Sequence, residues 1–191
     1  TGWYHIQLVW DSANVTSGDR MIIYVNGVRE TEFCTENYPD ASETSMINTA
    51  NPHAIGWHVG DSDKAFDGSM SHVQFVDGQA LAPTEFGEFD STSGIWKIKT
   101  SPSVSYGDNG GFWLKDGSQL TDSSSNSNTL TVGAGNITTT KDNPSNNFAT
   151  LNPLNIPTSN LPTYSSGNNT VTTQDAGSSY FGGTSTLGMV G

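Results

Sequence analysis

Two stretches decide the fold of this chain: WYHIQLVWD at residues 3–11 and RMIIYVNGV at residues 20–28. Large apolar residues recur at every second position of the first stretch, and a period of two predicts a β-strand. These residues are Tyr4, Ile6, Leu8 and Trp10. The second stretch is rich in β-branched residues and contains Asn26 and Gly27, a pair typical of tight hairpin turns because both tolerate positive φ. The sequence therefore predicts a hairpin, with residues 28–33 returning as the partner strand.

Charge and composition exclude several classes of function. The chain has 191 residues, with 7 basic and 19 acidic side chains and a formal net charge of -12. A nucleic-acid-binding protein needs a basic surface to meet phosphates, so we expect no nucleic-acid partner. Acidity also opposes binding to anionic lipid, and no apolar run is long enough to span a bilayer, so we expect no membrane insertion. The lone Cys34 permits no intrachain disulfide, and we expect it to be a small buried hydrophobe.

The rest of the chain predicts more short strands than helices. Alternation and β-branched residues indicate strands at residues 53–59 and 69–76, and shorter ones at residues 94–98 and 111–114. Residues 81–87 form the one plausible helical turn, with a proline near its start. The fold class predicted from these patterns is all-β.

Several segments resemble a known family. The strands at residues 3–11 and 20–28 resemble the strand pair of laminin-G-like domains, which belong to the concanavalin A-like β-sandwiches. Residues 54–56 are similar to a further strand of that fold, and residues 66–81 with 83–87 are similar to its closing strand and short helix. The resemblance implies an antiparallel β-sandwich of the jelly-roll type, of which this chain holds the later half.

The variant in this chain is most similar to modules in virion proteins of marine tailed phages. Four segments carry this similarity: residues 94–99, 111–114, 122–128 and 142–153. The last of them, DNPSNNFATLNP, is the most specific. The resemblance implies a virion protein.

We therefore expect four regions. Residues 1–90 are the later half of a laminin-G-like sandwich, and residues 91–141 are a β-rich appendage. Residues 142–170 hold four prolines among many Asn and Ser residues, which predicts an extended linker arm. Residues 171–191 are either the start of a further β domain or a disordered tail.

One loop offers candidate ligands. Asp61, Asp63 and Asp67 place three carboxylates within seven residues, a pattern that suits calcium, although an exposed turn whose aspartates cap backbone N–H groups has the same pattern. Calcium is the only cofactor that the sequence suggests. Trp57 and His58 stand beside this loop, and together with Asp61 they suit a sugar ring, which stacks on aromatic side chains and hydrogen-bonds to polar ones. Burial of Trp57 inside a sandwich is the simpler interpretation.

The acidic stretch formed by Glu85, Glu88 and Asp90 does not predict catalysis. Glycosidases of similar fold use two carboxyl groups about 5–9 Å apart on one cleft. Here the glutamates are three residues apart on a short turn, so we expect the acids to be solvated and the protein not to be an enzyme.

These observations favour a phage virion structural protein on the virion surface: a tail fibre, a tail-associated protein or a capsid-surface protein. A half-sandwich exposes sheet edges and an apolar face, so we expect it to pair with other virion proteins or with copies of itself in a symmetric oligomer such as a trimer. It would serve assembly or host attachment through a cell-surface glycan. The alternative is the carbohydrate-binding module of a secreted, extracellular adhesin, and a glucanase-type glycoside hydrolase is the third hypothesis.

Overall fold

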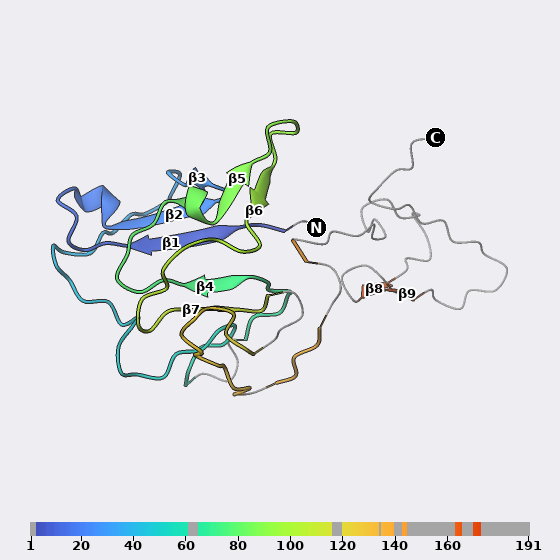
Figure 1. Ribbon diagram of the computed structural model, residues 1–191. Coiled ribbons are helices and arrows are strands. Elements are labelled where there is room, and N and C mark those ends of the chain that lie inside the picture. Colours follow the sequence, from blue (N-terminus) through green and yellow to red (C-terminus); the bar gives the residue numbers. More distant parts are fainter. Residues whose placement is uncertain are drawn as a thin grey trace. The chain divides into compact units, whose positions relative to one another are not determined.

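A computed structural model describes residues 3–60, 65–115, 120–133, 135–139, 143–144, 163–165 and 170–172. The chain divides into two compact units, Thr1–Gly135 and Asn136–Gly191. The described residues form short strands in small antiparallel sheets and two 3-10 helices, with no α-helix among them (Figure 1). The all-β prediction is thus confirmed at this level. The predicted arm and tail lie mostly outside the described residues; within them β8 (Thr163–Ser165) pairs with β9 (Thr170–Thr172).

The predicted hairpin is present in the first unit. Strands β1 (Ile6–Trp10), β2 (Met21–Val25) and β3 (Val28–Arg29) form an antiparallel sheet in that order, and the 3-10 helix η1 (Ser17–Asp19) lies between the first two. Asn26 and Gly27 adopt φ values of 49° and 78°, as a tight hairpin turn requires. Strand β3 is shorter than predicted: beyond Arg29, only the Glu30 N–H still bonds to β2, at the Ile23 carbonyl.

Trp96 fastens a second hairpin to this turn. Strands β5 (Gly87–Phe89) and β6 (Trp96–Ile98) pair after the 3-10 helix η2 (Pro83–Glu85), the helical turn expected from the sequence. The Trp96 ring leaves no room at Gly27, where a Cβ atom would lie 2.2 Å from the ring. The ring also stacks on His5 with centroids 5.8 Å apart, and its Nε1 donates to His5 Nδ1 at 3.1 Å. Phe89 meets it edge-on.

Most of the buried hydrophobic side chains lie in or beside a third sheet, in which β4 (Val73–Phe75) pairs with β7 (Gly111–Trp113). Four hydrophobic side chains are buried in the described part of the chain: Phe86, Tyr106, Phe112 and Trp113. Tyr106 stacks on Phe112, and its hydroxyl donates to Gln74 Oε1 at 2.8 Å. Burial, helped by the nearby Asp122 carboxylate, raises the pKa of Tyr106 to about 12. Trp113 Nε1 donates to the Asn128 carbonyl at 2.6 Å, which holds the following loop against β7.

Residues expected to form an appendage contribute to the first unit. Strand β6 pairs with β5 and strand β7 pairs with β4, so residues 91–115 complete sheets begun before residue 90. The strand expected at residues 53–59 is reduced to an isolated bridge between Trp57 and Ala65. The strand expected at residues 69–76 is confined to β4.

His5 gives the fold a pH dependence. Burial lowers its pKa below the ordinary value of 6.5, and a neutral ring is the form whose Nδ1 accepts from Trp96. The unfolded chain therefore binds a proton more readily, and the stabilisation from neutral His5 declines as the pH falls through about 6.5. We expect the thermal midpoint, followed by circular dichroism, to fall between pH 8 and pH 5, and to fall less in His5→Gln. Equal slopes for the two proteins would contradict this role.

Candidate functional site

One face of the β1–β2 strand pair is apolar along its whole length. Cross-strand partners share a face, and the register pairs Ile6 with Val25, Leu8 with Ile23 and Trp10 with Met21. On β1 and in the residues before it, this face is open: Tyr4 is 69% exposed, Ile6 68% and Leu8 51%. We call this surface the apolar face; its eight residues carry no charge. They are Tyr4, Ile6, Leu8, Trp10, Met21, Ile23, Val25 and Val28.

The same strand is a free sheet edge. Strand β1 stands at the end of the sheet order, and residues of odd number bond to β2: Asn26 N donates to the His5 carbonyl at 2.8 Å, and Asp11 N donates to the Arg20 carbonyl at 2.7 Å. Backbone groups alternate in direction along a strand, so those of Ile6, Leu8 and Trp10 point away from β2. They have no backbone partner among the described residues. An apolar face and a free edge thus meet on one strand.

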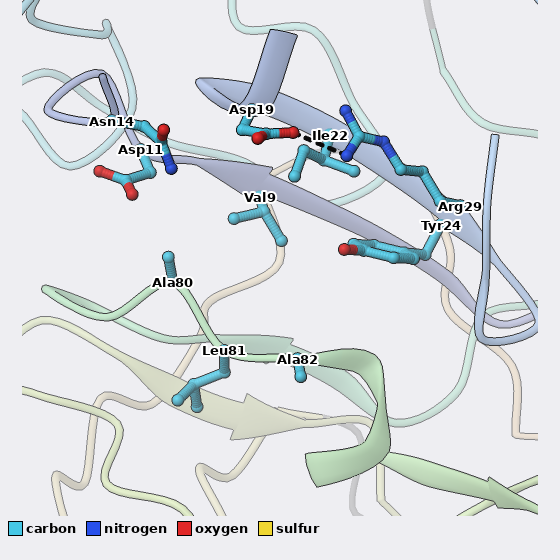
Figure 2. Close-up of a pocket in the computed structure, with 10 residues that line it drawn as sticks. All are labelled: Val9, Asp11, Asn14, Asp19, Ile22, Tyr24, Arg29, Ala80, Leu81 and Ala82. Atoms are coloured by element: carbon cyan, nitrogen blue, oxygen red, sulfur yellow. Dashed lines mark hydrogen bonds and ion pairs between the residues drawn. The ribbon is translucent and has the colours of Figure 1, made fainter. Parts of the chain in front are cut away.

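The opposite face of the sheet borders a cleft. Gln7 Nε2 donates to the Leu81 carbonyl at 2.8 Å, which ties the segment at residues 80–82 to β1. Between this segment and the sheet lies a cavity of about 380 Å³, which we call the 80–82 cleft (Figure 2). Its lining is mixed, with residues of β1 and β2, apolar residues of the 80–82 segment, polar residues of the β1–β2 connection and Arg29 of β3. They are Val9, Asp11, Asn14, Asp19, Ile22, Tyr24, Arg29, Ala80, Leu81 and Ala82.

An ion pair fixes one side of the 80–82 cleft. Arg29 Nη1 donates to Asp19 Oδ1 at 2.7 Å, and its Nη2 donates to the Gly18 carbonyl at 2.7 Å (Figure 2). Both side chains are partly exposed, so the pair contributes little to stability. The pair does link η1 to β3, and it neutralises one of the two carboxylates that line the cleft.

The structure describes only part of the loop site that the sequence predicts. Trp57 is half-buried, and His58 and Asp67 are exposed. Asp61 and Asp63 lie outside the described residues, so the calcium and sugar predictions for this loop remain predictions. Across the described ranges, no group of three or more His, Cys, Asp or Glu side chains could hold a metal ion.

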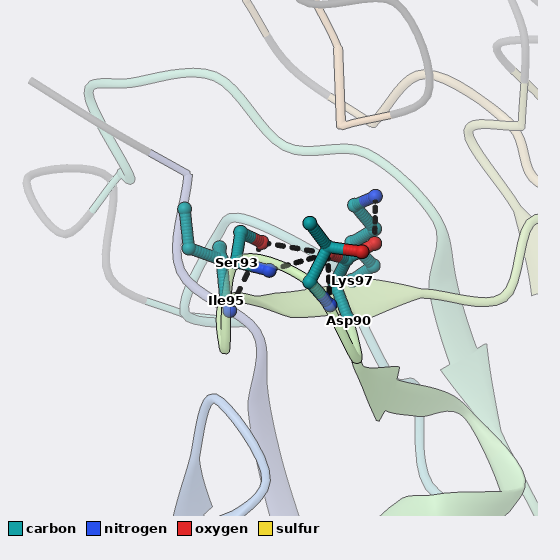
Figure 3. Close-up of polar contacts among 5 residues, drawn as sticks. Asp90, Ser93, Ile95 and Lys97 are labelled. Carbon is teal, nitrogen blue, oxygen red and sulfur yellow. Dashed lines mark hydrogen bonds and ion pairs between the residues drawn. The ribbon is translucent and has the colours of Figure 1, made fainter.

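Of the three acidic residues in and after η2, two are exposed and one stabilises a local turn. Glu85 and Glu88 are exposed, whereas Asp90 organises the turn between β5 and β6 (Figure 3). Its carboxylate accepts from Lys97 Nζ at 2.5 Å, and from Ser93 N at 2.8 Å and Ser93 Oγ at 2.9 Å. The lysine contact, followed by the Ser93 contacts, holds the pKa of Asp90 far below its usual value. A carboxylate held in this way is a poor proton donor.

The expectation that Cys34 is buried was wrong. Strand β3 ends at Arg29, so Cys34 falls in the coil beyond the sheet, and it is exposed.

Comparisons with known proteins add no information about the function of this site. No family model, no curated protein and no solved structure matches the chain. Among the segments that the structure describes, no helix is long and apolar enough to cross a membrane.

Proposed function

We propose that this chain is a non-enzymatic structural component of a tailed-phage virion surface, in a tail fibre, a tail-associated protein or the capsid surface. In this proposal the β1–β2–β3 sheet is one layer of a laminin-G-like β-sandwich. A second β-sheet, supplied by a neighbouring subunit, covers the apolar face. The observation that carries the proposal is the coincidence of this face with the free edge of β1.

The energetics of the apolar face support a covering layer. Fully burying one large apolar side chain is worth about 1.5–3 kcal/mol, and monomeric proteins seldom leave a large contiguous apolar patch in water. The eight residues of the face are uncharged, and the nearest acidic residue in register is Glu30, whose N–H donates to the Ile23 carbonyl just beyond β3, so charge opposes contact only at that margin. A sheet is the surface that fits it best, because two sheets pack face to face about 10 Å apart with interdigitating side chains.

The thin core supports the same conclusion. No side chain in the described part of the chain falls below 2% exposure, and three of the four buried hydrophobic residues, Tyr106, Phe112 and Trp113, lie in or against β7 rather than in the β1–β2–β3 sheet. A small core stabilises a domain only weakly. An added layer over the apolar face would supply the missing burial.

The phage assignment is supported by sequence resemblance. Residues 142–153 are its most specific segment and lie almost wholly outside the described residues. A carbohydrate-binding module of a secreted adhesin is the second candidate, and the 80–82 cleft favours it. The glucanase hypothesis gains no support, because Asp90 is engaged by Lys97 and the backbone of its own turn.

The apolar face can be tested by placing a charge on it. Leu8→Asp puts a carboxylate in the middle of the face, and Val15→Asp puts one at an equally apolar, 94% exposed residue away from the sheet. We expect the purified chain to self-associate through the uncovered face in sedimentation velocity. Leu8→Asp should weaken this association at least about tenfold, since burying an unpaired charge is costly, and Val15→Asp should leave it unchanged. A wild-type chain that sediments as a 20.3 kDa monomer at all concentrations would contradict the proposal.

A further inference from the structure

We propose that the 80–82 cleft binds a neutral saccharide ring. The inference rests on the proposed function in one respect: it gives that surface protein an attachment site for a glycan. It concerns the face of the sheet opposite the apolar face and is separate from the loop around Trp57.

The shape of the cleft suits a small cyclic ligand. Its volume of about 380 Å³ lies within the range of small-molecule sites, roughly 300–1,000 Å³. Figure 2 shows Val9 and Ile22 on the sheet side, with Tyr24 beside them, and the 80–82 segment on the opposite side. The apolar C–H face of a sugar can lie against the tyrosine ring and these aliphatic side chains.

Polar groups that can still form hydrogen bonds line the cleft beside these apolar side chains. The Asp11 carboxylate and the Tyr24 hydroxyl make no hydrogen bond to any described residue. Asn14 Oδ1 accepts from Thr16 N at 3.0 Å, which leaves the Asn14 amide N–H groups to donate. Asp19 uses one carboxylate oxygen for Arg29 and retains the other. Sugar hydroxyls both donate and accept, so they can satisfy the carboxylate acceptors and the amide donor together.

Charge selects the ligand class. Two carboxylates line the cleft against a single guanidinium, and that guanidinium already lies 2.7 Å from Asp19. A phosphate, a sulfate or an acidic sugar would meet net repulsion from Asp11. A neutral polyol meets none, and its hydroxyls form charge-assisted hydrogen bonds, which are stronger than neutral ones.

The test is saturation-transfer NMR on the purified chain with three probes: methyl α-mannoside, methyl β-galactoside and methyl β-glucoside. We expect saturation transfer to at least one of them. Asp11→Ala should weaken that binding about tenfold, the loss typical of a hydrogen bond to a charged group. The Asp11 side chain has no described partner, so this variant should keep the wild-type thermal midpoint. Asp67→Ala, which removes an exposed carboxylate from the other candidate loop, is the matched control and should bind as wild type.

Two results would overturn the inference. One is the absence of saturation transfer to all three glycosides. The other is loss of binding in Asp67→Ala with binding retained in Asp11→Ala, which would place the sugar at the loop around Trp57. Neither result bears on the apolar face, whose test is the sedimentation of Leu8→Asp. The two proposals can therefore fail separately.

Discussion

Asp122→Ala is expected to lower the free energy of unfolding by about 3–5 kcal/mol, because it removes the centre of a buried hydrogen-bond network. The Asp122 carboxylate is 8% exposed. It accepts from the backbone N–H groups of Phe112, Ser124 and Asn128, each at 2.8 Å, and from the Ser124 hydroxyl at 2.9 Å. Alanine would leave these donors without partners beside β7. Chemical denaturation followed by tryptophan fluorescence measures the effect.

Two further measurements separate this role from a general sensitivity to mutation. Asp108→Ala, at an exposed aspartate of the preceding turn, should change the unfolding free energy by less than about 0.5 kcal/mol. Burial by itself raises the pKa of Asp122, but the three backbone donors and the Ser124 hydroxyl outweigh it and leave the pKa below 3.8. The stabilisation is therefore complete above about pH 3.8 and is lost as the pH falls through the folded-state pKa. A wild-type-like Asp122→Ala at pH 7 would contradict the network.

Gly110→Ala is expected to destabilise the protein by about 3 kcal/mol or more, because backbone atoms occupy the space of the new methyl group. A Cβ atom at Gly110 would lie 1.9 Å from the Tyr106 carbonyl oxygen and 2.6 Å from the Phe75 carbonyl oxygen. Neither atom can rotate away as a flexible side chain could, so β4 and the turn before β7 must move apart. Thermal denaturation followed by circular dichroism should show a large fall in the midpoint.

Gly18→Ala is the matched control for this substitution. Its Cβ atom would meet only the Tyr38 ring, at 3.9 Å, which is an ordinary contact. Its expected effect is below about 1 kcal/mol. Similar losses in the two variants would mean that the close approach at Gly110 does not limit stability.

The sequence predicted the first hairpin because its signals are local. The period of two along residues 3–11 and the positive-φ pair Asn26 and Gly27 need no tertiary information. The same alternation could not say which face is covered. The more apolar face, which contains Ile6 and Leu8, is the exposed one, because the 80–82 segment and Trp96 pack on the other side.

The two candidate sites differ in the same way: one is made of neighbours in the sequence, and the other is formed only by tertiary packing. The cluster of Asp61, Asp63 and Asp67 is visible in sequence because its members are close neighbours. The 80–82 cleft was missed because Asp11, Tyr24 and the 80–82 segment come together only through the packing of residues about 70 positions apart. Similarly, residues 122–128 stood out in the sequence only through the resemblance to phage modules, and nothing local revealed that Asp122 would be buried and bonded to Phe112.

The most direct test of the covered apolar face is hydroxyl-radical footprinting of the native assembly that contains this chain, read out by peptide mass spectrometry. Tyr4 and Trp10 report on the face, and Tyr38, which is 39% exposed and lies beside Gly18 of η1, is the internal reference. Our account predicts that Tyr4 and Trp10 are oxidised much more slowly than Tyr38 in the assembly, and that Tyr4 becomes the faster of the two tyrosines once the chain is isolated. Oxidation of Tyr4 in the native assembly at a rate equal to or above that of Tyr38 would show that nothing covers the face, and would contradict the account.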